Sequence, residues 1–179
     1  MINELIKIDK TFNEAMFKTK VDNIFIMLHS SIMTDNLNRV LHFLSDELKI
    51  KFQKKLDELN SKNYRQMYDE LNVESTTIEN INITDDKIII KVKIISNYMD
   101  YIVDKTTLKY ISGINTGRIK KINYLTFEKL RNTKRIESVR KCPGCGASIS
   151  VNTNGKCIYC GTIFNQKDYD FILTSFIVE

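Results

Sequence analysis

The residues best suited to chemistry are concentrated in one short stretch, Lys141 to Gly161, which holds all four cysteines of the chain. They form two C-x2-C pairs, Cys142 with Cys145 and Cys157 with Cys160, and eleven residues separate the pairs. A two-residue spacing places both sulfurs on one side of a tight turn. Two such turns supply the tetrahedral set of four thiolates that suits Zn²⁺. The spacing therefore predicts a zinc site with these four ligands.

The residues around the cysteines favour a small module that folds around this ion. A glycine follows the second cysteine of each pair, where turns of this kind tend to need a positive φ. Between the pairs, Asn154-Gly155 is a strong hairpin signal. We therefore expect a zinc ribbon with a structural ion, because four thiolates leave no open coordination position and metal binding supplies folding free energy. A rubredoxin-like iron site and a redox-active dithiol remain as alternatives.

Two histidines and one aspartate are the other candidates for chemistry. His29 and His42, the only histidines, fall in helical pattern and could form an acid–base pair with a nearby aspartate in a pocket. Asp100 stands between Tyr98 and Tyr101, where a buried carboxylate could be catalytic. The alternatives are histidines at the edge of a helix face and a solvated carboxylate. Because the sequence has no nucleophile elbow, P-loop or G-x-G-x-x-G motif, we expect a protein that is not an enzyme.

Positive charge is concentrated just before the cysteines. Residues 118–141 contain nine basic and two acidic residues, whereas the whole chain has a net charge of only +5. Such a segment can attract phosphates or anionic lipid head groups, or it can be an ordinary solvated sheet face and loop. Nucleic-acid binding through this segment and the ribbon is the third functional hypothesis, because the ribbon offers few aromatic side chains on which bases could stack.

A helical first third is expected to position these groups. Apolar residues recur every three or four positions over residues 5–32, which predicts helix. A polar break at residues 34–36 separates this stripe from a short helix predicted over residues 37–44. Ser45 is the predicted N-cap of the next helix, whose apolar stripe covers residues 48–59.

The pattern then changes to strands. A last helical piece is predicted around residues 64–71, after which β-branched and aromatic residues alternate between short polar turns. The predicted strands cover residues 75–83, 87–103, 107–113 and 118–130, and the sequence GINTG separates the last two. Helices followed by consecutive strands predict the α+β class, with N-terminal helices packed on a curved antiparallel sheet.

Two units are expected along the chain. Residues 1–137 form the α+β domain, and residues 138–179 form the zinc ribbon and a closing strand. Hydrophobic residues make up 42% of the chain, enough for a packed core. The N-terminus lacks the apolar region of a secretory signal, and no run is long enough to span a bilayer. We therefore expect a cytoplasmic protein with reduced thiols, able to touch a membrane surface through its basic segment.

The sequence resembles the Tim44-like domain proteins, in the bacterial form that carries a C-terminal zinc ribbon. The resemblance covers most of the chain. Its sharpest part is CPGCGASISVNTNGKCIYCG followed by YDFILTSF, where Phe171 stands at a position that is usually tryptophan in the family. The opening helices and the late strands are also similar, and Phe127 and Lys129 fall near a motif usually read as aromatic-x-Arg.

This resemblance implies a cone of the cystatin and NTF2-like type, in which helices pack into a bent antiparallel sheet that often has an apolar pocket at its mouth. For mitochondrial relatives it implies a membrane-peripheral scaffold in protein translocation, with affinity for anionic lipid and for a chaperone. We therefore expect a binding or scaffold module with a protein partner or an anionic membrane surface. The alternative is a pocket protein that binds a small apolar ligand or acts as an enzyme.

Overall fold

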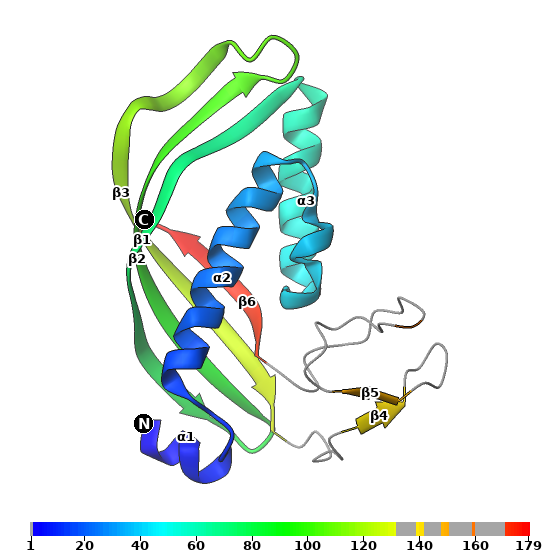
Figure 1. Ribbon diagram of the computed structural model, residues 1–179, viewed down its shortest axis with the longest axis vertical. Helices are drawn as coiled ribbons and strands as arrows, with labels where there is room; N and C mark the ends of the chain where they lie inside the picture. The colour runs from blue at the N-terminus through cyan, green and yellow to red at the C-terminus, as the bar shows by residue number, and fades with distance from the viewer. Residues whose placement is uncertain (1, 132–138, 142–147, 151–158, 160–170) are drawn as a thin grey trace.

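The computed structural model describes residues 2–131, 139–141, 148–150, 159 and 171–179 (Figure 1). The helical elements among them are α1 (Ile2–Ile8), α2 (Glu14–Met33), the 3₁₀ turns η1 (Leu37–Arg39) and η2 (Leu41–Phe43), and α3 (Asp46–Ser61). The strands are β1 (Tyr64–Ile83), β2 (Lys87–Asp104), β3 (Tyr110–Leu130), the short β4 (Val139–Lys141) and β5 (Ser148–Ser150), and β6 (Ile172–Val178).

The main sheet is antiparallel and has the order β1-β2-β3-β6. Figure 1 shows that the sheet curves along its length and that α2 and α3 lie on its concave side. This arrangement confirms the predicted α+β class with N-terminal helices on a curved antiparallel sheet. It is also consistent with the cone that the resemblance implies. The predicted boundary at residues 137 and 138 lies outside the described residues.

The helices begin at capping residues and bury one face each. The Asn13 side chain accepts a hydrogen bond from the Met16 amide and starts α2. Ser45 caps α3 through the Leu48 amide at 3.3 Å, as the sequence predicted. The predicted stripe is interrupted between α1 and α2, however, because the Asp9 side chain bonds the amide and hydroxyl of Thr11 in a turn. Met16 is consequently 73% exposed and lies outside the core.

The helical piece predicted at residues 64–71 was wrong. Asn63 ends α3 in the left-handed region, with φ of 56°, and β1 starts at the next residue. Tyr64 then pairs with Asp104 at one end of β1, and Ile83 pairs with Ile88 at the other. Local sequence did not show this pairing, because the β2 partners of residues 64–69 lie 30 to 40 residues further along the chain.

The GINTG sequence is not a turn between two strands. β3 continues through it, but Tyr98 of β2 pairs with Ile119, and Asp100 pairs with Ile114. Residues 115–118 therefore bulge opposite a single residue of β2. A bulge bends the strand and increases its local twist. The turn-like composition thus marked a bulge inside one strand.

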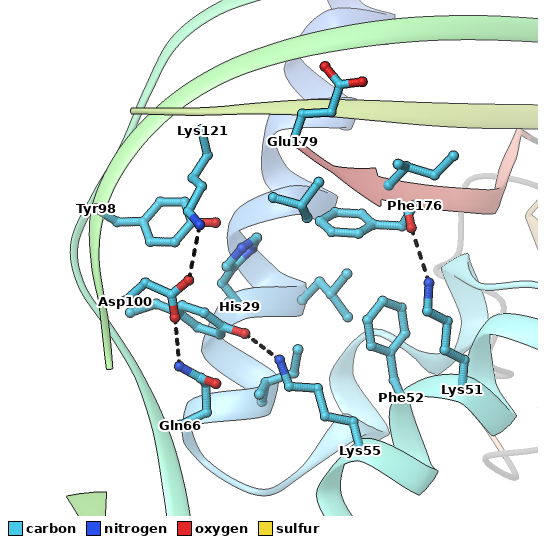
Figure 2. Close-up of a pocket in the computed structure, with 15 residues that line it drawn as sticks. His29, Lys51, Phe52, Lys55, Gln66, Tyr98, Asp100, Lys121, Phe176 and Glu179 are labelled. Carbon is cyan, nitrogen blue, oxygen red and sulfur yellow. Dashed lines mark hydrogen bonds and ion pairs between the residues drawn. The ribbon is translucent and has the colours of Figure 1, made fainter. Parts of the chain in front are cut away.

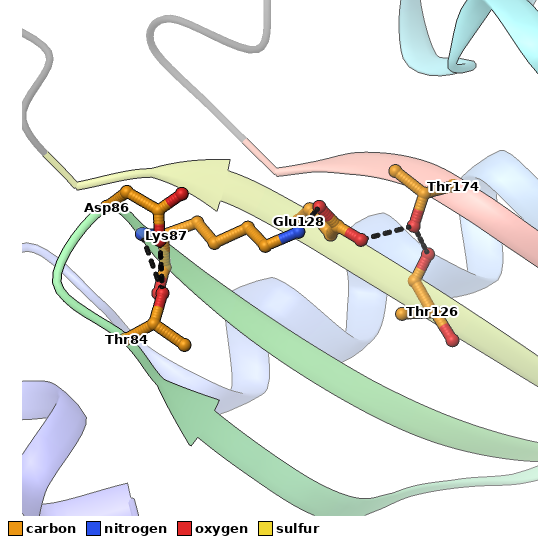
Figure 3. Close-up of polar contacts among 6 residues, drawn as sticks. All are labelled: Thr84, Asp86, Lys87, Thr126, Glu128 and Thr174. Carbon is orange, nitrogen blue, oxygen red and sulfur yellow. Dashed lines mark hydrogen bonds and ion pairs between the residues drawn. The ribbon is translucent and has the colours of Figure 1, made fainter.

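The chain returns to the sheet after residue 170, and polar contacts help hold β6 beside β3 (Figure 3). The Thr174 hydroxyl donates to the Thr126 carbonyl at 3.2 Å and lies 3.3 Å from a carboxylate oxygen of Glu128. The other oxygen of that carboxylate pairs with Lys87 of β2 at 3.0 Å. These contacts link three neighbouring strands across the sheet.

Phe127 and Lys129, which the family resemblance singled out, belong to a cluster that joins distant segments. The rings of Phe17 and Phe127 lie 5.6 Å apart, and those of Phe17 and Phe171 lie 5.2 Å apart. The Lys129 ammonium lies over the Phe171 ring and pairs with Asp9 at 2.7 Å. This ion pair lowers the pKa of Asp9, against the opposing effect of its burial. The cluster therefore holds α2, β3 and the residue before β6 together.

Candidate ligand-binding pocket

A cavity of about 580 Å³ lies between the concave face of the sheet, α2 and α3 (Figure 2). Its volume is within the range of roughly 300–1,000 Å³ that is typical of small-molecule sites. The apolar lining consists of Leu28, Ile32, Phe52, Phe176, Ile177 and Val178. The polar lining consists of His29, Lys51, Lys55, Gln66, Tyr68, Tyr98, Asp100, Lys121 and Glu179. A mixed lining of this kind can hold a ligand that is partly apolar.

His29 lies in the wall of the pocket on α2 and is only 4% exposed. Its Nδ1 is 2.8 Å from the Phe25 carbonyl oxygen and donates a hydrogen bond to it. Burial lowers the His29 pKa to about 4, although the bond to Phe25 opposes this shift. The imidazole is therefore neutral at pH 7. Because Nδ1 carries the proton, Nε2 is left as a hydrogen-bond acceptor.

Two tyrosines surround this imidazole and remain protonated. The rings of Tyr68 and Tyr98 meet the His29 ring edge-on, at centroid distances of 4.7 and 5.3 Å. Burial raises the pKa of both phenols, and the negative charge of Asp100 raises it further. Their hydroxyl groups are consequently neutral and able to form hydrogen bonds at any physiological pH.

Asp100 is held in place by neighbours on both sides (Figure 2). Gln66 Nε2 donates to one carboxylate oxygen at 2.9 Å and also to the Tyr101 carbonyl at 3.0 Å. Lys121 Nζ lies 3.6 Å from the other carboxylate oxygen. Both oxygens of Asp100 therefore have partners within the protein, which fixes the orientation of the carboxylate.

The polar groups that line the cavity can be compared with the usual parts of a hydrolytic site. Among the described residues, no Ser, Thr or Cys lines the cavity, and no hydrogen bond joins His29 to Asp100. A nucleophile and a base that orients it are the usual parts of a hydrolytic site. The groups present are instead fixed hydrogen-bonding groups and cations beside an apolar wall.

The structure brings His29 and Asp100 into one pocket but leaves His42 apart from them. His42 lies on η2, where the centroid of its ring is 4.0 Å from that of Phe43 and the two rings are tilted at 44°. The predicted zinc ligands Cys142, Cys145, Cys157 and Cys160 lie outside the described residues, so the zinc site stays a prediction. Within the described ranges, no group of His, Cys, Asp and Glu side chains is arranged to hold a metal ion.

Lys55, Gln66 and Tyr68 were missed as site residues by sequence reasoning. Gln66 and Tyr68 fall in the segment mistaken for helix, so their projection from β1 into the pocket could not be foreseen. Lys55 gave a fainter signal, because it lies next to the apolar stripe of α3 rather than opposite it. A lysine in that position can extend its aliphatic stem along the apolar surface.

The described part of the basic segment is largely paired with acids. The ion pairs are Arg118 with Glu70 at 3.5 Å, Lys120 with Glu74 at 3.3 Å, Lys121 with Asp100 at 3.6 Å and Lys129 with Asp9 at 2.7 Å. The first two pairs are exposed, and such pairs are weak and easily exchanged. The structure describes no side chain of this segment beyond Arg131. Among the described helices, none is long and apolar enough to cross a membrane.

Comparisons with known proteins match most of this fold to one family. A family model described as the Tim44-like domain matches residues 1–136. No curated protein sequence matches the chain. Among solved structures, the chain is similar to the intermembrane space region of the chloroplast protein ARC6, with 8% sequence identity and a TM-score of 0.35. That match covers 90% of this chain and 95% of the other.

Proposed function

This chain belongs to the Tim44-like domain family, and we propose that it is a non-enzymatic binding module whose ligand site is the pocket between α2, α3 and the sheet. The proposal includes a structural zinc ion at the four cysteines and a cytoplasmic location. The single observation that carries the binding role is the pocket itself, because it combines apolar walls with polar groups that are already held in position.

Catalysis is the alternative use of the same pocket. His29 and Asp100 both line it, and the His29 pKa is strongly shifted, which is a feature shared by many active sites. The shift makes His29 a weak base, however, since a pKa of about 4 lies far from neutral pH. Asp100 is engaged by Gln66 and Lys121. These contacts support binding as the function of the site.

A role at membrane surfaces in protein transport is the second part of the proposal, and family membership supports it. We propose that a protein partner or an anionic membrane surface contacts the basic segment at residues 118–141. Because four of its described cations have acidic partners, we expect this contact to be weak and sensitive to salt. The pocket is therefore the main site of the proposed function.

Co-purification tests the pocket directly. We expect protein isolated from its native cells and extracted with solvent to release a small molecule in near-stoichiometric amount, identified by mass spectrometry. Val178→Trp places a large ring at the pocket lining, where Val178 is 43% exposed, and should abolish this retention. Ile50→Trp is the matched control, because Ile50 is 70% exposed on α3 and does not line the pocket.

Two results would contradict the binding role. One is the absence of any enriched small molecule in the wild-type protein, and the other is equal retention by the Val178→Trp variant. The same preparations, sedimented with phosphatidylglycerol vesicles at low salt, address the membrane role separately. Failure to sediment under those conditions would remove it.

A further inference from the structure

Two lysines of α3 reach the pocket without a carboxylate partner (Figure 2). Lys55 Nζ donates to the Tyr68 hydroxyl at 2.8 Å, and Lys51 Nζ donates to the Phe176 carbonyl at 3.2 Å. Both acceptors are neutral. Within the described part of the chain, neither lysine forms an ion pair, and the negative charge of Asp100 acts on Lys55 only from beyond ion-pair distance.

The acidic groups of the pocket lie elsewhere. Asp100 is bound by Gln66 and Lys121, as described above. The Glu179 side chain points away from the two lysines in Figure 2. Near α3, the remaining lining groups are uncharged: His29 is neutral and Tyr68 is protonated. The lysines therefore have no carboxylate within ion-pair distance among the described residues, because Asp100, whose charge raises the Lys55 pKa, is bound by Gln66 and Lys121.

Lys55 is poorly solvated in this position. Its side chain is half-buried between α3 and β1, and burial is the main reason that its pKa lies below the ordinary value for lysine. A charged group removed from water gains free energy when a counter-charge is placed beside it. Lys51, one helical turn earlier, is exposed and lies at the pocket lining, where it can contact the same ligand.

We propose that the pocket binds a small, free organic anion, whose acidic group lies between Lys51 and Lys55 and whose apolar part packs against Phe52 and Phe176. This inference rests on the proposed function, because it names the ligand class of the same pocket. A free organic acid and an anionic lipid head group share this chemistry. The cavity of about 580 Å³ between the helices and the sheet has a volume typical of sites for small free molecules.

Calorimetric titration with a matched pair of probes tests the proposal. 4-Phenylbutanoate and 4-phenylbutanamide share an apolar body and differ in charge. We expect the wild-type protein to bind the acid roughly tenfold tighter than the amide or better, since a charge-assisted hydrogen bond is lost with the amide. Lys55→Met should weaken binding of the acid by about tenfold and leave binding of the amide unchanged, because methionine keeps most of the apolar stem.

Lys54→Met is the matched control, because Lys54 is an exposed lysine of the same helix that does not line the pocket. It should bind both probes as the wild type does. Equal affinities for acid and amide in the wild type would overturn the proposal without any variant. An equal loss of affinity for the acid in the Lys54→Met and Lys55→Met proteins would also overturn it. If Lys55→Met fails to fold, the acid-to-amide ratio of the wild type decides the matter.

Failure of the ligand class and failure of the pocket are distinguishable. If the wild type binds both probes equally and Val178→Trp abolishes this binding, the anion proposal is wrong but the pocket remains a binding site. Binding of neither probe, together with no co-purified molecule, would contradict both. A third outcome is that the protein sediments with phosphatidylglycerol vesicles through Lys55 but does not bind 4-phenylbutanoate. This result would assign the lysines to a lipid head group and would contradict the proposal of a free organic anion.

Discussion

At the scale of single residues, His29 shows how burial changes the role of a side chain. In the sequence it is one of two similar histidines in helical pattern. In the fold its ring lies among Phe25, Tyr68 and Tyr98, and its charged form is excluded. His42 keeps a more exposed position on η2, and its pKa is also lowered, by burial and by Lys20. The tertiary environment thus separates two residues that the sequence presents alike.

The His29 environment predicts that stability depends on pH in a specific window. The unfolded chain takes up a proton near pH 6.5, whereas the folded protein resists it until about pH 4. The free energy of unfolding contributed by neutral His29 is therefore complete above pH 6.5 and is lost as the pH falls toward 4. The loss should be about 3 kcal/mol at most. Urea denaturation at pH 7.5 and 4.5 measures it.

His29→Gln should reduce this loss, because the variant has no group that titrates at this position. His42→Gln is the control, and its free energy of unfolding should still fall between pH 7.5 and 4.5 by most of the wild-type amount. Asp9 and Asp35, whose pKa values are lowered from the ordinary value of 3.8, lose most of their contribution below that pH, outside this window. An equal loss for the wild type and His29→Gln would show that another group controls the pH dependence.

At the scale of elements, β3 depends on one glycine that lies two residues before its bulge. Gly113 has a φ of +101°, a region that other residues rarely adopt. It also lies close to β2, because a Cβ atom at this position would be 2.5 Å from the Asp100 carbonyl and 2.6 Å from the Tyr101 Cα. The backbone of β2 at Asp100 therefore lies too close to residue 113 for any side chain to fit there.

Gly113→Ala should consequently destabilise the protein by about 2 kcal/mol or more, through both backbone strain and the contact with β2. Gly117→Ala provides the control, at a glycine of the same strand that lies in the bulge itself. A Cβ atom at Gly117 meets nothing within 4 Å, so we expect a change within about 0.5 kcal/mol. The midpoints of urea denaturation compare the two variants. Equal midpoints would show that the bulge rearranges without cost.

At the scale of the whole molecule, the chain leaves the main sheet after β3 and returns to it as β6. The residues in between include the four cysteines. Phe171, which contacts Phe17, and β6, which pairs with β3, follow them in the chain. A structural metal would supply folding free energy to a segment of this size. The zinc proposal therefore concerns the pairing of β6 with β3 as well as the folding of the cysteine segment itself.

We expect protein purified without added metal to contain about one zinc ion per chain by elemental analysis, because two C-x2-C pairs supply one tetrahedral set of ligands. Cys142→Ser should lower the zinc content below half an equivalent, because the site loses one of its four thiolates. The Cys142→Ser variant should also unfold at a lower temperature. Free-thiol titration provides the check: cysteines joined as disulfides in the wild-type protein would rule out the site.

The sequence by itself determined the features that depend on local order. The 3.6-residue stripe predicted α2 and α3, Ser45 predicted the start of α3, and the richness in β-branched and aromatic residues predicted β2. These features are local because a cap or an amphipathic face is set by residues within a few positions of each other. The spacing of the cysteines is local in the same sense, which is why a metal site could be proposed for it.

Only the tertiary structure decided the pocket and the course of β1 and β3. Residues 64–69 became strand because β2 offered a partner for each of them, and GINTG became a bulge because β2 continued past it. The pocket joins Lys55 of α3, His29 of α2 and Asp100 of β2, which are far apart in the chain. Their burial, and hence their charges and pKa values, arises from contacts between these elements, and no local pattern of residues encodes such contacts.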